Sequence, residues 1–317
     1  MTRRAASTRG RSGDRTEPSR AVTRRPRGRW LRAALAVLTA GTMALTSLAA
    51  GAPAANAAPG DAFDPANPVI FIAQDLSPTR LYIAEQGNVN AILQGGTGGF
   101  AYNAIGFNTV DNYLYGIRRE TAAQDNPSLT NHLLRIGEGG VVTDLGAVAG
   151  LPRATTNRAF NQAAFGTGAG AQTLFVRRAA SEALLWKIDV SAATPTAVQV
   201  NLSAPVPNLS DVVYLDGYLW GFHSNGRAYR IDPVSGAVSS FVHNLGNGWD
   251  GTSWSFGAQW VFGNGNIGLS RNSTGVIYQV RIDGATTATP SFTLVSRSEG
   301  PASSNNDGAT IGGLEGD

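Results

Sequence analysis

The sequence has 317 residues, no cysteine and a formal net charge of +3 at pH 7. Without thiols the chain can form no disulfide, thiolate metal site or iron–sulfur cluster. The positive charge is concentrated at the N-terminus: residues 1–32 hold eleven arginines, whereas residues 58–317 carry 14 basic and 20 acidic side chains, a net charge of −6. We therefore expect no nucleic-acid partner for the folded part of the chain.

The first predicted element is a secretory signal peptide over residues 1–57. Its arginine-rich head is followed by an uncharged apolar run at 33–50 and by the small-residue site Ala55-Asn56-Ala57. A basic head, an apolar middle and an Ala-x-Ala end are typical of such leaders. We expect Ala55 and Ala57 to occupy the cleavage site, with cleavage after Ala57 and a secreted, extracellular protein.

Two alternatives concern the export of the chain. Arg24-Arg25 could serve the twin-arginine route, but Pro26 follows directly, so the general secretory route is favoured. An uncleaved membrane anchor is the other alternative, because the eighteen residues at 33–50 nearly span a bilayer. After cleavage we expect no stable membrane span.

Residues 58–317 predict many short strands and no long helix. They are rich in Gly, Asn, Ser and Thr, with short runs of Val, Ile, Tyr and Phe. This composition favours an all-β fold with tight turns. We expect a short linker at 58–68, one domain at 69–300 and a flexible C-terminal tail at 301–317.

One four-strand unit recurs along the domain. The clearest copies are 102–146 and 211–238, each with an apolar strand, a tight turn, an aromatic strand, a third strand ending in Arg-Ile and a fourth strand after a Gly turn. Weaker copies lie at 69–93, 161–190 and 257–283. The later copies are spaced by about 45 residues, a period typical of four-stranded propeller blades.

The repeat predicts a β-propeller of about five four-stranded antiparallel blades. A sixth blade is the alternative if 118–131 or 191–208 contain further strands. We expect the two chain ends to complete one blade, with 291–296 pairing with the first or the last blade. A sandwich or a β-solenoid competes with this prediction, but neither would repeat a four-strand unit of this length.

Six segments resemble a domain family of secreted actinobacterial and other bacterial proteins. They are YNAIGFNTVDNYLYGI, LLRIGEGGVVTDLG, VVYLDGYLWGF, YRIDPVSGAV, GAQWVFGNGNIGLSRNSTGVIYQV and FTLVSRSEGPASSNNDGA. The resemblance covers about residues 69–309 and is most specific at 257–280. It implies an extracellular propeller-like module and supplies no catalytic residues. Because no sortase-type signal follows Asp307-Gly308, we expect no covalent attachment to a cell wall.

Four polar residues stand at or near the start of the apparent innermost strands: Asn103, Gln162, Asp211 and Gln259. In a propeller such positions can line one mouth of the central channel, so we predict that they bind a ligand there. Asp211 alone carries charge, which favours a cation, an amine or sugar hydroxyls. The alternative is that these side chains satisfy loop backbone groups.

Trp249 and Trp254 flank a loop and form a second candidate site, since an aromatic ring can stack on a sugar. A lid on the core is the alternative role for either ring.

We predict no metal site and no cofactor. His132, His223 and His243 lack the close spacing of metal ligands. The stretches 244–254 and 303–308 carry oxygen ligands near glycine but one Asp each, fewer carboxylates than calcium usually takes. Calcium stays open as the alternative.

The predicted function is a non-enzymatic recognition or interaction module for an extracellular glycan, peptide or protein. A propeller hydrolase or lyase with an active site at the channel mouth is the first alternative. It lacks a histidine beside Asp211 and a Gly-x-Ser-x-Gly elbow. A structural spacer domain is the second alternative.

Overall fold

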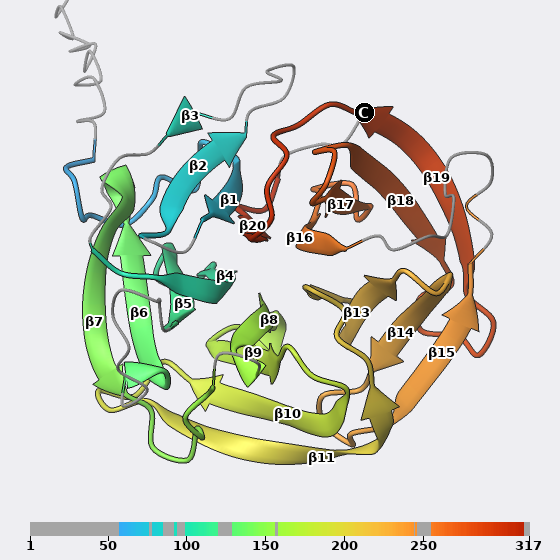
Figure 1. Ribbon diagram of the computed structural model, residues 1–317, viewed down its shortest axis with the longest axis horizontal. Coiled ribbons are helices and arrows are strands. Elements are labelled where there is room, and N and C mark those ends of the chain that lie inside the picture. Colours follow the sequence, from blue (N-terminus) through green and yellow to red (C-terminus); the bar gives the residue numbers. More distant parts are fainter. Residues whose placement is uncertain are drawn as a thin grey trace, which may run out of the picture. The chain divides into compact units, whose positions relative to one another are not determined.

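The structure, a computed structural model, describes residues 57–75, 78–84, 92–93, 99–119, 129–155, 158–243, 245 and 255–313. Their strands form five antiparallel sheets of four strands each. Figure 1 shows these sheets as the blades of a propeller, with β4, β8, β16 and β20 near its centre and β7, β11, β15 and β19 at its rim.

Within each blade the strands follow chain order from the centre to the rim, except that β20 is the inner strand of blade 1. Blade 1 contains β20 (Asn306–Thr310), β1 (Ile70–Gln74), β2 (Arg80–Ala84) and β3 (Ile92–Leu93). Blade 2 contains β4 (Tyr102–Asn108), β5 (Tyr113–Arg118), β6 (His132–Gly137) and β7 (Val141–Ala147). Blade 3 contains β8 (Phe160–Phe165), β9 (Thr173–Arg178), β10 (Glu182–Asp189) and β11 (Thr196–Val206). Blade 4 contains β12 (Val213–Leu215), β13 (Tyr218–His223), β14 (Arg227–Ile231) and β15 (Val238–Val242). Blade 5 contains β16 (Phe256–Val261), β17 (Ile267–Arg271), β18 (Ile277–Asp283) and β19 (Ser291–Ser298). Short 3₁₀ turns occur at Glu138–Gly140 and Gly168–Gly170.

The five-blade prediction is confirmed and the six-blade alternative is wrong. The stretch at 191–208 supplies β11, which pairs with β10 as the outermost strand of blade 3. The stretch at 291–296 lies in β19 and pairs with β18, so it belongs to the last blade.

The sequence between β14 and β15 contains Asp232-Pro233 and Ser235-Gly236, and the structure shows how these residues form a hairpin turn. The Asp232 carboxylate accepts hydrogen bonds from the backbone N–H of Val234 at 2.8 Å and of Ser235 at 3.2 Å. Gly236 then adopts a φ of 76°, a conformation that glycine reaches without strain. The side-chain cap and the glycine together reverse the chain between the two strands.

Buried apolar side chains form five clusters, one at each seam between neighbouring blades. This arrangement explains why the second strands are buried on both faces, as in β13 at Leu219, Trp220 and Phe222. Among the described residues, the seam between blades 5 and 1 has the smallest cluster: Ile70, Ile72, Ala84, Ala258 and Trp260.

Closure is made by β20, which pairs antiparallel with β1 from Ile70↔Thr310 to Gln74↔Asn306. The two ends of the domain thus complete one blade, as predicted. This inner strand lies within 301–317, the stretch predicted as a flexible tail, so the domain extends at least to Thr310. The sequence Asn-Asp-Gly-Ala-Thr has little strand propensity of its own, and its pairing with β1 determines its conformation.

The predicted linker at 58–68 also contacts the blades. Gly60 N–H donates to the Glu138 carbonyl at 2.8 Å, and Glu138 N–H donates to the Asp61 carbonyl at 2.8 Å. The Phe63 ring is buried 4.6 Å from the Phe71 ring, in the cluster between blades 1 and 2. This segment therefore contributes to the core of the domain.

Candidate functional site

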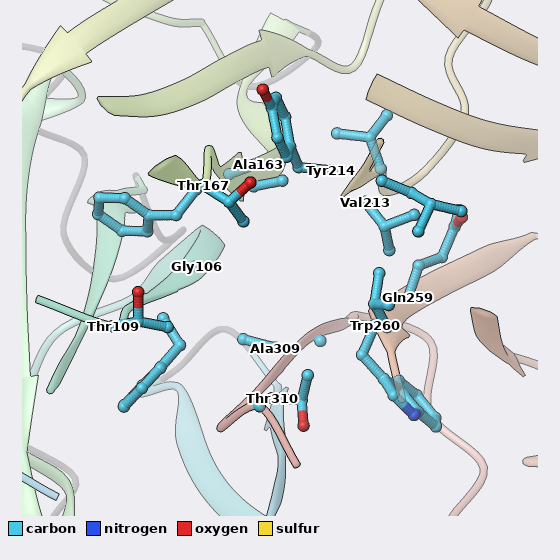
Figure 2. A pocket seen from close by; sticks show the side chains of 18 of the residues that line it. Gly106, Thr109, Ala163, Thr167, Val213, Tyr214, Gln259, Trp260, Ala309 and Thr310 are labelled. Carbon is cyan, nitrogen blue, oxygen red and sulfur yellow. The ribbon is translucent and has the colours of Figure 1, made fainter. Parts of the chain in front are cut away.

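A cavity of about 420 Å³ lies at the centre of the ring, where the inner strands of all five blades converge. Figure 2 shows residues from these strands and the turns after them around the open space: Gly106, Thr109, Ala163, Thr167, Val213, Ala309 and Thr310. Many of them are small, so backbone and short side chains form much of the wall. The volume of the cavity falls in the range of small-molecule binding sites.

The cavity reaches solvent where the inner strands end. Thr109, Thr167 and Asp216 line it and are exposed. Asp216 has a φ of 52° and Gly217 a φ of 87°, as expected for a tight two-residue hairpin turn. The mouth therefore presents two threonine hydroxyls and one carboxylate.

The four predicted contact residues lie near the opposite ends of the inner strands. Asn103, Gln162, Asp211 and Gln259 expose 4, 0, 0 and 1 % of their surface, respectively. Gln259 lines the cavity, and the other three lie outside its lining. The structure thus puts this polar group at the inner end of the cavity, and ligand contact by its members stays a prediction.

A fifth member of the group, Asp307, was missed because it lies in the predicted tail. It is fully buried on β20, the inner strand of blade 1. The segment Asn306-Asp307-Gly308-Ala309 parallels Asn161-Gln162-Ala163-Ala164 on β8. That likeness, a polar pair followed by two small residues, is the sequence signal that could have identified it.

Asp211 joins blade 4 to blade 5. Its Oδ1 accepts the N–H of Val212 at 2.7 Å, and its Oδ2 accepts the N–H of Gln259 on β16 at 2.7 Å. Gln259 Nε2 in turn donates to the Asp211 carbonyl at 2.8 Å. These contacts fit the alternative role of the polar residues, in which they satisfy backbone groups.

Asp307 joins blade 1 to blade 2 in the same way. Its Oδ1 accepts the N–H of Gly308 at 2.9 Å, and its Oδ2 accepts the N–H of Ile105 on β4 at 2.8 Å. The Asp307 carboxyl group also forms a hydrogen bond with the Asp211 carboxyl group. We call the two residues Asp211 and Asp307 the carboxyl clasp, because together they connect blades 1, 2, 4 and 5.

The clasp retains protons that exposed carboxyl groups release. Burial, reinforced by the charge of Asp307, raises the pKa of Asp211 well above its usual range. Burial raises the pKa of Asp307 to about 8, against its backbone hydrogen bonds, which lower it. A hydrogen bond between two carboxyl groups requires that one of them carry a proton.

Gln162 belongs to a second buried group, centred on Arg177 in blade 3. Arg177 is fully buried, and its guanidinium donates to Gln162 Oε1 at 2.7 Å and to the Val206 carbonyl at 3.0 Å. It also reaches the carbonyls of Leu184 and Glu182, both at 3.3 Å. One planar cation thus connects β8, β10 and β11. A guanidinium suits this role better than an ammonium, because its N–H donors point in several fixed directions in one plane.

The three histidines lie apart. His132 Nδ1 lies 2.9 Å from Asp144 Oδ1, on β6 and β7 of blade 2. His223 Nδ1 accepts the N–H of Asn225 at 3.2 Å. His243 packs 5.6 Å from the Phe222 ring, and burial lowers its pKa to about 4. Each has a local structural contact of its own.

Two other predicted sites cannot be placed in full. Trp249, Trp254 and most of 244–254 lie outside the described residues. In the other stretch considered for calcium, Ser303 Oγ donates to the Asn305 carbonyl at 2.9 Å, and Asp307 belongs to the clasp. Across the described ranges, no group of three or more His, Asp or Glu side chains is arranged to hold a metal ion. The same ranges contain no helix long and apolar enough to cross a membrane.

The fold and the site define this chain as a five-bladed β-propeller with a central cavity that opens at one end and has a buried polar group at the other. It belongs to the family described as "Repeat of unknown function (DUF6923)", whose model matches residues 71–313. This confirms the resemblance to a propeller family without assigned activity.

Among solved structures, the chain is similar to a protein of unknown function from Bacteroides thetaiotaomicron, with 15% identity and a TM-score of 0.43 over 66% of this chain and 51% of that one. It thus spans about half the length of that protein. A protein of unknown function from Bacteroides caccae has 10% identity and a TM-score of 0.41, over 74% and 73% of the chains. Myxococcus xanthus glutaminyl cyclase has 12% identity and a TM-score of 0.37, over 61% and 70%. No curated protein matches the chain.

Proposed function

We propose that this protein is a secreted, non-enzymatic recognition module that binds an extracellular glycan, peptide or protein segment in its central cavity. The observation that carries the proposal is the cavity of about 420 Å³ lined by inner-strand residues of all five blades. A ligand there would contact the whole ring.

The walls supply hydrogen-bonding groups without many polar side chains. Each inner strand has a paired neighbour on one side only, so its free edge leaves backbone N–H and C=O groups toward the axis. Ala163 and Ala309 leave room for a ligand to approach that edge, and Thr109 and Thr167 add hydroxyls at the mouth. Such a wall selects a ligand by shape and hydrogen bonds.

The clasp makes the inner end of the cavity rigid. Asp211 and Asp307 hold the inner strands of neighbouring blades through backbone amides. A binding site whose walls are already ordered loses less conformational entropy when the ligand arrives. The polar group therefore supports binding by positioning the walls, whether or not its members touch the ligand.

Narrowing the mouth tests the proposal. Thr167 is exposed, lines the cavity and caps no backbone group with its side chain, so Thr167→Trp places an indole in the entrance at little cost in stability. For a ligand found by glycan and peptide array screening, we expect at least about a tenfold loss of affinity, or ~1.4 kcal/mol. Isothermal titration calorimetry measures it.

Thr293→Trp is the matched control, because Thr293 is exposed on the outer strand β19. It should bind like the parent protein. Equal affinity of Thr167→Trp and Thr293→Trp for the ligand would contradict binding in the central cavity.

Secretion has its own test. The exported protein should begin at Ala58, because Ala55 and Ala57 fit the cleavage pattern of secretory leaders. N-terminal sequencing of protein recovered from culture medium measures this directly. Secreted material that still begins at Met1 would show that the leader is not removed.

A further inference from the structure

A second cavity, of about 580 Å³, opens between blades 3 and 4. It shares Thr167 and Tyr214 with the central cavity, so the two spaces adjoin at the mouth. We call it the seam cleft and define it by the residues that line it: Thr167, Ala169, Gly170, Thr173, Phe175, Lys187, Asp189, Thr196, Val198, Tyr214, Pro233 and Val234.

Two rows of side chains from blade 3 form one wall of the seam cleft. The strand register sets Phe175 and Val198 on either side of Lys187 and sets Thr173 and Thr196 on either side of Asp189. Because side chains two apart on a strand share a face, both rows point the same way.

Blade 4 supplies the opposite wall, with Tyr214, Pro233 and Val234. The Tyr214 ring stacks on Phe175 with centroids 5.7 Å apart. Val234 is 84% exposed, and Val198 across the cleft is 60% exposed. The cleft thus combines apolar surface that is still open to solvent with one row of polar groups.

Lys187 is the single lysine of the sequence, and it is half-buried in this cleft. Within the part of the chain that the structure describes, its ammonium has no hydrogen bond or ion pair. Asp189, two residues away, is instead bound by the Ser191 N–H at 2.9 Å and the Ser191 hydroxyl at 2.6 Å. In a domain of net charge −6, the cleft therefore holds one cation whose hydrogen-bonding capacity is unused.

We propose that the seam cleft binds a carboxylate-bearing sugar of an acidic glycan. The Lys187 ammonium would donate to the sugar carboxylate, and such charge-assisted bonds are the strong ones. Asp189, Thr173 and Thr196 would bind ring hydroxyls. The sugar would rest its C–H face on apolar surface of Tyr214, Val198 and Val234.

This proposal deepens the proposed function and rests on it. The sugar that follows the acidic one in the glycan would pass Thr167 and enter the central cavity. A sugar fits the lining better than a peptide carboxylate does. Beside its carboxylate, a uronic acid presents several hydroxyls, and the Asp189 row supplies acceptors and hydroxyls next to Lys187.

Calorimetry with a galacturonic acid tetrasaccharide tests the proposal, with its fully methyl-esterified form as the neutral probe. Lys187→Gln should weaken binding of the acidic tetrasaccharide at least about tenfold. Lys187→Arg keeps the charge, so its affinity for the acidic tetrasaccharide should stay within about threefold of that of the parent protein. The esterified probe should bind the parent protein as weakly as the acidic probe binds Lys187→Gln. Arg281→Gln, at an exposed cation on β18, is the control and should leave binding unchanged.

The single lysine also provides a direct readout. Reductive methylation with ¹³C-formaldehyde labels Lys187 and the terminal amine, while the dimethylated ammonium keeps its charge and one N–H. The acidic tetrasaccharide should shift the Lys187 methyl resonance and leave that of the terminal amine in place. The neutral probe should shift neither.

Any of the following results would overturn the proposal: Lys187→Gln binds the acidic tetrasaccharide as well as the parent protein does, the parent protein binds both probes with equal affinity, or the acidic probe does not bind. A peptide that binds through its free C-terminal carboxylate and depends on Lys187, while the sugar does not bind, would also overturn it. Thr109→Trp separates the two proposals, because Thr109 is exposed and lines the central cavity but not the seam cleft. If it leaves Lys187-dependent binding intact, the seam cleft stands and the central cavity fails. If it abolishes binding of a neutral glycan that ignores Lys187, the central cavity stands and the seam cleft fails.

Discussion

Replacing Asp307 by alanine should lower the free energy of unfolding by about 3–5 kcal/mol. The carboxyl group is fully buried and accepts the N–H groups of Gly308 and Ile105. The substitution leaves both donors without a partner and removes the hydrogen bond to Asp211. Asp307 lies in the blade that β20 closes, beside the seam whose described residues form the smallest apolar cluster. Urea unfolding followed by tryptophan fluorescence measures the loss.

A matched control and a mutant cycle identify the cause. Asp283→Ala removes an aspartate whose carboxylate pairs with Arg281 at an exposed site, and it should change the free energy of unfolding by at most about 0.5 kcal/mol. Asp211→Ala and Asp307→Ala combined should cost clearly less than the sum of the single losses, since both break the same hydrogen bond. Fully additive losses would show that the two carboxyl groups act independently.

The pH dependence of stability gives a second readout of the clasp. Burial raises the pKa of Asp307 from 3.8 to about 8, so above pH 3.8 the unfolded chain releases a proton that the folded chain keeps. This stabilisation is complete below pH 3.8 and is lost as the pH rises through 8. His243 acts oppositely: burial lowers its pKa from 6.5 to about 4, so its contribution is complete above pH 6.5 and is lost as the pH falls through 4.

Between pH 6.5 and 8 the contribution of the clasp to the free energy of unfolding therefore changes with pH, whereas that of His243 stays constant. There the free energy of unfolding should fall with rising pH, by up to about 1.4 kcal/mol per pH unit for each proton retained. Asp307→Asn cannot titrate at that position and should make the slope shallower, and the part that remains comes from Asp211, whose pKa burial also raises. A parent protein whose stability rises across this window would contradict the protonated clasp.

Replacing Arg177 by methionine should cost about 3 kcal/mol of folding stability. The side chain is fully buried and donates to Gln162 Oε1 and to backbone carbonyls of two strands. Burial lowers its pKa to about 10, so it stays charged at neutral pH. Methionine relieves the cost of burying that charge but leaves several acceptors unpaired. Thermal and urea unfolding of the purified variant measure the net loss.

Two further variants separate charge from geometry. Arg177→Lys keeps the charge but loses the planar fork, so it should still cost about 2 kcal/mol. Arg281→Met, at an exposed position, should cost no more than about 0.5 kcal/mol. If Arg177→Lys is as stable as the parent, the positive charge matters in blade 3 and the guanidinium geometry does not.

The repeat and its hairpins follow from the sequence alone because short-range chemistry determines them. In β5 and β13 the aromatic strands Tyr-Leu-Tyr-Gly-Ile and Tyr-Leu-Trp-Gly-Phe pair as the pattern predicts. At β14–β15 the Asp232 cap and Gly236 set the turn within five residues. The period of such units predicts blades, and blades must stack to bury their faces.

The inner end of the cavity was only partly predictable. Sequence position put Asn103, Gln162, Asp211 and Gln259 at or near the starts of inner strands. In the structure Asn103 and Gln162 lie in the first three residues of their strands, Asp211 precedes β12, and Gln259 is the fourth residue of β16. The likeness of residues 306–309 to residues 161–164 hints that Asp307 joins them. Asn306–Thr310 nevertheless becomes a strand only by pairing with Ile70–Gln74 at the other end of the domain. Gly308 shows the same dependence on distant structure: a Cβ there would lie 2.8 Å from the Gln259 backbone nitrogen.

The tertiary structure decided which polar side chains are buried and which groups they contact. Whether a polar side chain near an inner strand meets a ligand or a backbone amide depends on the neighbouring blade, as the Asp211 bond to Gln259 shows. The same holds for Lys187, whose cleft exists only because Tyr214, Pro233 and Val234 of the next blade stand opposite it. Local sequence determines which side chains a strand carries, but their surroundings come from the strands that the ring brings beside them.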